Sequence, residues 1–179
     1  MNGALRLAMQ ALLHWRTRPS LVAMALRGED FPAAPPLEPG RVTVGLAQMR
    51  LDLADSAGAY ARHACRLVRD AVEGGAQLIA FPEYTGLPLL GLLPGAKRLD
   101  RGEPLADALN ELGGTSLRVA DIFRATAPAV CRAYLATFSA LAAGFRVYLA
   151  AGTVIAVGAD GKLYNTAHLF GPDGALIGT

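Results

Sequence analysis

The stretch Leu78-Ile79-Ala80-Phe81-Pro82-Glu83-Tyr84 predicts a buried strand that ends at a proline and is followed at once by a carboxylate. Pro82 has no N–H for a strand ladder, so we expect the strand to stop there. Glu83 then stands at the carboxyl end of a strand, where ligands bind in open α/β sheets. Because a carboxylate held and partly buried beside an apolar wall is suited to proton transfer, Glu83 is a candidate general base. The alternative is that Glu83 caps a following turn or pairs with an arginine.

The residues before this stretch predict a strand followed by a helix. Residues 42–48 are nearly all apolar, as expected for a strand covered on both faces. Asp55 or Ser56 is a candidate N-cap, and apolar residues between 60 and 72 recur at helical spacing. A glycine pair at 74–75 ends the helix. The short connections indicate a βαβ unit, so we expect its two strands to be parallel neighbours.

The residues after Glu83 alternate between breakers and helical patterns. Residues 86–95 interleave leucines with glycines and prolines, which favours a loop that lines a pocket or covers a partner surface, or a short packed helix. We expect a solvated charge cluster at 98–103, a short helix at 104–112 and a long helix at 116–143. Pro128 within the long helix indicates a kink or a new first turn.

The last third of the chain changes to an antiparallel style. Residues 146–151 predict a strand that leads to Gly152-Thr153. Two further strands, 154–157 and 163–170, are joined by the hairpin turn Gly158-Ala159-Asp160-Gly161-Lys162, and another turn leads to a strand that begins at Ala175. The sequence therefore predicts a parallel α/β arrangement in the first part of the domain and antiparallel strands joined by hairpins in the last part.

The first forty residues form a separate prediction. Residues 1–28 have helical patterning, with Leu5, Met9, Leu12 and Leu13 on one face, and Pro19 interrupts it. This segment is either a helix packed on its own domain or an amphipathic segment that binds a partner. Residues 29–40 contain four prolines and predict a stiff, extended linker. We therefore divide the chain into an extension, 1–40, and a domain, 41–179.

The composition indicates a folded globular protein that binds neither nucleic acid nor an anionic membrane surface. Of the 179 residues 53% are apolar and 18% charged, and the net charge is +2. The arginines are scattered, so we expect no nucleic-acid partner and no polybasic membrane anchor. The long apolar stretch near 119–145 is interrupted by charges, no signal peptide is convincing, and we expect a cytoplasmic protein.

The cysteines and histidines predict neither a disulfide nor a metal site. Cys65 and Cys131 lie in helical segments at apolar positions, which suits a reducing compartment. Cys131 is a tempting nucleophile, but an inert buried cysteine is the common case in such a setting. The three histidines, His14, His63 and His168, are far apart, and we expect no metal and no cofactor.

Several enzyme motifs are absent from the sequence. It contains no Gly-x-Ser-x-Gly elbow, and no Gly-x-Gly-x-x-Gly follows the first strand. Lys162 follows a glycine but lacks the upstream glycine of a phosphate-binding loop, so we interpret it as a hairpin-turn lysine.

The ordered pieces together resemble the nitrilase superfamily, the carbon–nitrogen hydrolases. The resemblance is carried by the runs Val42–Met49 and Leu78–Tyr84, then by Ala151-Gly152-Thr153, Asp160–Ala167 and Phe170–Gly174. It covers residues 41–179. The resemblance implies an α/β fold, a nitrilase-like α-β-β-α sandwich that is incomplete at the C-terminus, in which two mixed sheets lie between helices.

The resemblance also implies a Glu-Lys-Cys mechanism. In it glutamate is the general base, cysteine attacks a nitrile or amide carbon, and lysine stabilises the developing anion. Glu83 matches the glutamate. The other two members have no match, because Lys97, Lys162 and Cys131 do not stand in the family's lysine and cysteine motifs.

We therefore expect the N-terminal portion of a carbon–nitrogen hydrolase, with a small amide or nitrile as substrate and a homo-oligomer as the complete protein. The isolated 179-residue chain is expected to show no turnover. Two alternatives stay open: a half-domain that assembles with a partner chain supplying lysine and cysteine, or a non-catalytic ligand-binding module in which Glu83 only recognises an amine.

Overall fold

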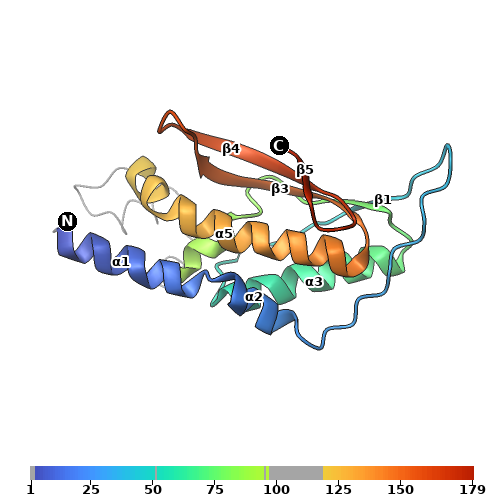
Figure 1. Ribbon diagram of the computed structural model, residues 1–179, viewed down its shortest axis with the longest axis horizontal. Coiled ribbons are helices and arrows are strands. Elements are labelled where there is room, and N and C mark those ends of the chain that lie inside the picture. The colour runs from blue at the N-terminus through green and yellow to red at the C-terminus, as the bar shows by residue number, and fades with distance from the viewer. Residues whose placement is uncertain (1–2, 51, 95, 97–118) are drawn as a thin grey trace.

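A computed structural model describes residues 3–50, 52–94, 96 and 119–179 as helices packed on one face of a five-stranded sheet (Figure 1). The strand order β1-β2-β3-β4-β5 follows the chain. The strands are β1 Val44–Leu46, β2 Leu78–Ala80, β3 Tyr148–Val157, β4 Leu163–Phe170 and β5 Leu176–Gly178. The first three are parallel and the last two are antiparallel additions, which confirms the predicted change of style.

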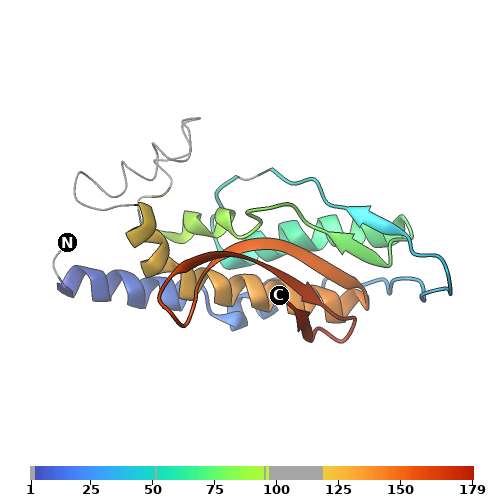
Figure 2. The same cartoon turned by 90° about the horizontal axis from the view of Figure 1, so that it is seen from above.

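The helical layer lies behind the sheet when the molecule is turned, as Figure 2 shows. Its elements are α1 Gly3–Arg16, α2 Pro19–Leu26, α3 Ala57–Glu73, the 3-10 helix η1 Leu87–Leu92 and α5 Val119–Phe145. The core between the layers is made by the long helix α5 and the sheet, with Tyr134, Phe138 and Phe145 fully buried. The α/β fold class is confirmed.

Helix α3 forms as the sequence predicts. The Ser56 hydroxyl accepts a hydrogen bond from the Ala59 N–H at 3.0 Å, so Ser56 rather than Asp55 is the N-cap. Gly75 ends the segment with a φ of +87°, a conformation that glycine adopts without strain. The helix connects two parallel neighbours, β1 and β2, and the βαβ prediction is confirmed.

Strand β1 differs from its prediction. It covers three residues, and Val44 and Leu46 expose 47% and 81% of their surface. Only the face of Gly45 is covered, where an added Cβ would stand 3.0 Å from the Cβ of Ala71. The expectation of two covered faces is therefore wrong for the described residues, because helices pack on one side of this edge strand and no described element packs on the other.

Strand β3 is longer than predicted. The expected break at Gly152-Thr153 is instead a bulge inside one continuous strand, with a register shift between Ala150 and Thr153. Gly152 has a φ of +70°, which allows the extra residue to be absorbed without ending the strand.

The N-terminal segment packs on the body of the protein. Leu13 of α1 and Val22 of α2 are buried in the common core, in agreement with a helix packed on its own domain. The segment 29–40 has no helix and only one isolated bridge, as the linker prediction requires. It is nevertheless docked, because the Phe31 ring lies edge-on to Phe145 at 4.9 Å.

A glutamine also fastens this linker to the sheet. The Gln77 amide donates to the Pro36 carbonyl, and its oxygen accepts from the Thr43 N–H at 3.0 Å. The Ala34 N–H donates to the Phe145 carbonyl at 2.7 Å. The division into an extension and a domain at residue 40 stays a prediction.

The remaining predictions concern the segments around α5. Residues 87–92 form the short helix η1, with Leu89, Leu90 and Leu92 buried, so the packed alternative describes this stretch. Helix α5 continues through Pro128, and Figure 1 shows it bending in its N-terminal part. The predicted charge cluster at 98–103 and helix at 104–112 lie outside the described residues.

Candidate active site

Glu83 lies in the turn that leaves the carboxyl end of β2. Its side chain is exposed, which corrects the expectation of partial burial. The Asn165 side-chain amide donates to Glu83 Oε1, with Nδ2 and Oε1 2.5 Å apart. Among the described residues no arginine pairs with Glu83, so the contact that fixes this carboxylate is an amide from β4.

The backbone of this turn is held in an unusual conformation. Tyr84 has a φ of +60°, in the left-handed region that costs a non-glycine residue about 1 kcal/mol or more. Its N–H donates to the Thr153 hydroxyl at 2.7 Å, and the Thr85 hydroxyl donates to the Pro82 carbonyl at 2.6 Å. These bonds hold the turn that presents Glu83 against β3.

The bulge at Gly152 is shaped to receive the turn. A Cβ at this position would stand 2.0 Å from the Pro82 carbonyl oxygen and 2.4 Å from Thr85 Oγ1. The Tyr134 hydroxyl, on α5, donates to the carbonyls of Ala151 and Gly152 at 3.0 and 3.1 Å. Tyr134 of α5 therefore fixes the bulge, and the bulge in turn fixes the turn that carries Glu83.

A second buried tyrosine supports the far end of the turn. The Tyr60 hydroxyl, on α3, donates to the Thr85 carbonyl at 3.0 Å. Burial raises the pKa of both Tyr60 and Tyr134, so both phenols stay protonated and act as donors. Helices α3 and α5 thus both contribute to the position of Glu83.

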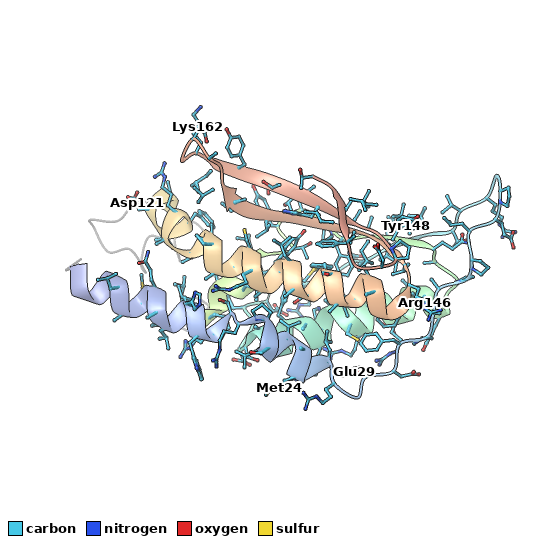
Figure 3. All side chains as sticks on the ribbon, in the orientation of Figure 1. Met24, Glu29, Asp121, Arg146, Tyr148 and Lys162 are labelled. Atoms are coloured by element: carbon cyan, nitrogen blue, oxygen red, sulfur yellow. The ribbon has the colours of Figure 1, made fainter. Side chains whose placement is uncertain are left out.

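The other sequence-predicted residues lie elsewhere. The Cys131 thiol donates to the Ile155 carbonyl at 3.4 Å, and burial raises its pKa to about 11, as expected for an unreactive thiol. Lys162 stands at the tip of the β3–β4 hairpin, as Figure 3 shows, and pairs with Asp160 at 3.1 Å. Lys97 lies outside the described residues. The structure does not bring Glu83 together with either Cys131 or Lys162.

No metal site accompanies the turn in the described part of the chain, where no three His, Cys, Asp or Glu side chains gather. The chemistry that Glu83 and Asn165 offer is proton transfer by a carboxylate beside a neutral hydrogen-bond donor.

Sequence reasoning missed Asn165, Thr153 and the two tyrosines as parts of this site. Asn165 and Thr153 stand inside runs that carry the family resemblance, and that was the available signal. Nothing in the sequence marks Tyr60 and Tyr134, whose spacing is that of ordinary buried helix residues.

Comparison with protein families identifies the chain. The family profile described as carbon-nitrogen hydrolase matches residues 43–179. The chain belongs to the carbon–nitrogen hydrolase family. The resemblance to the nitrilase superfamily is thereby confirmed, and with it membership of a family of hydrolases that act on C–N bonds.

Comparison with known structures adds a carbon-nitrogen hydrolase from Helicobacter pylori G27, which is 21% identical and aligns with a TM-score of 0.45. The match covers 76% of this chain and 38% of that one, so the chain spans less than half the length of this hydrolase. No curated protein matches the sequence.

Of the helices in the described ranges, none combines the length and the apolar character that crossing a membrane requires.

Proposed function

We propose that Glu83 is the general base of a carbon–nitrogen hydrolase whose substrate is a small amide or nitrile. The observation that carries this proposal is the fixed carboxylate at the end of β2, held by Asn165 within a family of hydrolases. Glu83 takes the proton of a cysteine thiol, and the thiolate attacks the amide or nitrile carbon. A lysine stabilises the developing anion, and the proton taken by Glu83 passes to the leaving ammonia or amine. For a nitrile, one water first adds to the thioimidate before ammonia leaves. Water then hydrolyses the thioester.

The lysine and the cysteine of this mechanism come from outside residues 1–179. Cys131 is turned to the Ile155 carbonyl, and its raised pKa leaves almost no thiolate at neutral pH. Lys162 is engaged at the hairpin tip. We therefore expect no turnover from residues 1–179 alone.

A second function is favoured by the open face of the sheet. Val44 and Leu46 of β1 and Ile177 of β5 are exposed apolar residues, whereas Leu176 pairs with Phe170 on the side of α5. An apolar sheet face of this kind is suited to a second chain that also supplies the missing lysine and cysteine. In this case the active protein is an assembly of two different chains.

The test compares the 179-residue chain with the complete gene product. Ammonia release is measured with short aliphatic and aromatic amides and nitriles, for the parent proteins and for Glu83→Gln. Glu73→Gln is the matched control, because Glu73 is an exposed glutamate at the end of α3. We expect turnover only in the complete product, lost in Glu83→Gln and kept in Glu73→Gln.

Three outcomes separate the candidates. Turnover by the 179-residue chain alone that is lost on Glu83→Gln would contradict the proposal that this chain is inactive. Turnover that appears only when a second protein co-purifies supports the assembly. Saturable amine binding without a covalent intermediate, lost on Glu83→Gln, would replace both with a binding module.

A further inference from the structure

We infer that Asn165 is a positioning residue that sets the orientation of the Glu83 carboxylate. The inference rests on the proposed role of Glu83 as general base and adds a residue to its machinery. Asn165 lies on β4 opposite Ile155 of β3, so its backbone is fixed by the hairpin ladder. Its side chain reaches across the sheet to a residue 82 positions earlier in the chain.

The chemistry of the contact suits a base. An amide N–H does not titrate, so Asn165 orients the carboxylate without competing for the proton that a base must accept. A lysine or arginine in its place would hold the proton acceptor in an ion pair and weaken it as a base. A neutral donor therefore fixes Glu83 without forming an ion pair with it.

The contact is also selective for one oxygen. Nδ2 of Asn165 bonds to Oε1, and within the described ranges Oε2 of Glu83 has no hydrogen-bond partner. Since Oε1 already accepts one N–H and Oε2 keeps both of its lone pairs, we expect Oε2 to be the oxygen that accepts the proton. Asn165 thus decides which oxygen faces the reaction.

The backbone and the side chain of Glu83 are fixed from two different strands. Thr153 of β3 accepts from the Tyr84 N–H and holds the turn, whereas Asn165 of β4 holds the carboxylate. Glu83 has three side-chain torsions, and its exposed position provides no packing to restrict them. Without Asn165 we expect these torsions to average among rotamers.

A purely structural role for Asn165 makes a different prediction. Its side chain is exposed, and its amide has no bond in the described chain other than that to Glu83. Removing it therefore leaves the fold intact. This separates a positioning role from a structural one.

The first experiment measures the Glu83 rotamer in the 179-residue chain by side-chain NMR couplings. We expect one rotamer in the parent chain, averaged couplings in Asn165→Ala and an unchanged melting temperature. Tyr164→Phe is the control, since it removes a hydroxyl from the neighbouring β4 position that bonds to Asp160 and not to Glu83. A single rotamer that persists in Asn165→Ala overturns the inference, and so does averaging in the parent chain.

The second experiment measures hydrolysis by the complete gene product. Misplacement of a catalytic group by about 1 Å costs on the order of 100-fold in rate, so Asn165→Ala is expected to lower kcat by about that factor and leave KM unchanged. If Glu83→Gln abolishes turnover and Asn165→Ala does not change it, the inference fails and the proposed function stands. If Glu83→Gln stays active, the proposed function fails, while the NMR experiment still decides whether Asn165 fixes the carboxylate.

Discussion

Replacing Gly152 with alanine tests the contact between the Glu83 turn and the β3 bulge. The backbone cost of placing alanine at a φ of +70° is about 1–2 kcal/mol. The new Cβ also stands 2.0 Å from the Pro82 carbonyl oxygen and 2.4 Å from Thr85 Oγ1. Both atoms belong to the ordered turn, so relief requires the turn to move, which adds about 1–3 kcal/mol. We expect a total loss of about 2–5 kcal/mol in the free energy of unfolding.

Gly161→Ala is the matched control for this change. Gly161 has a φ of +75°, close to that of Gly152, but a Cβ there would meet nothing within 4 Å. It therefore carries the backbone cost of about 1–2 kcal/mol and no collision. Urea unfolding followed by far-UV circular dichroism gives both values. If the two variants lose the same free energy of unfolding, the turn does not approach the bulge as described, and the reasoning about the site is refuted.

Three further perturbations test other parts of the structure. Burial lowers the pKa of His168, whose Nδ1 finds no hydrogen-bond partner among the described residues, so the stability contributed by its neutral ring is present above about pH 6.5 and is lost as the pH falls toward the folded-state pKa. Urea titrations on both sides of pH 6.5 should show a smaller pH dependence of the free energy of unfolding in His168→Phe. In Gly144→Ala the new Cβ would stand 2.6 Å from the Phe31 ring, so we expect a loss of about 1–3 kcal/mol that Phe31→Ala largely removes in the double variant, whereas additive losses would contradict the docking of the linker. With a pKa of about 11, Cys131 should react with a disulfide reagent on the order of 100-fold more slowly at neutral pH than a free thiol, and fast labelling of Cys131 in the native state would contradict its raised pKa.

Local signals in the sequence predicted most elements of this fold. The proline after Phe81, the serine cap at Ser56 and the glycine pair at 74–75 act within a few residues of their own position, so their effects are readable from the sequence. The parallel pairing of β1 with β2 follows from the helix between them. These are also the elements on which the position of Glu83 depends.

The errors arose where the outcome depends on distant residues. The apolar run at 42–48 is compatible with a strand covered on both faces, but coverage depends on which elements reach that edge of the sheet. Gly152 was interpreted as a break because an isolated glycine marks a bulge and a strand end equally well. The bulge exists because Tyr134 and the Glu83 turn both hold it, and neither contact is local.

The candidate site likewise combines features that local sequence predicts with contacts between distant residues that it does not. Glu83 was identified from its own stretch, yet its exposure and its partner were not, since Asn165 lies 82 residues away. The hydrogen bond depends on the register of β4 against β3, and a shift of one residue turns Asn165 to the other face of the sheet. A candidate base can be proposed from sequence, whereas the residue that contacts it required the structure.

The order of the strands bears on how the protein is made. Each described strand lies beside the one that precedes it in the chain, and among these five no strand has to enter between two others. The sheet can therefore grow from one side during translation, as each strand leaves the ribosome and pairs with the strand before it. Until its successor arrives, the newest strand is an unpaired edge, and this is the stage at which nascent chains associate with one another. The long β3–β4 hairpin shortens that stage, because its second strand follows the first after a turn of only five residues, 158–162.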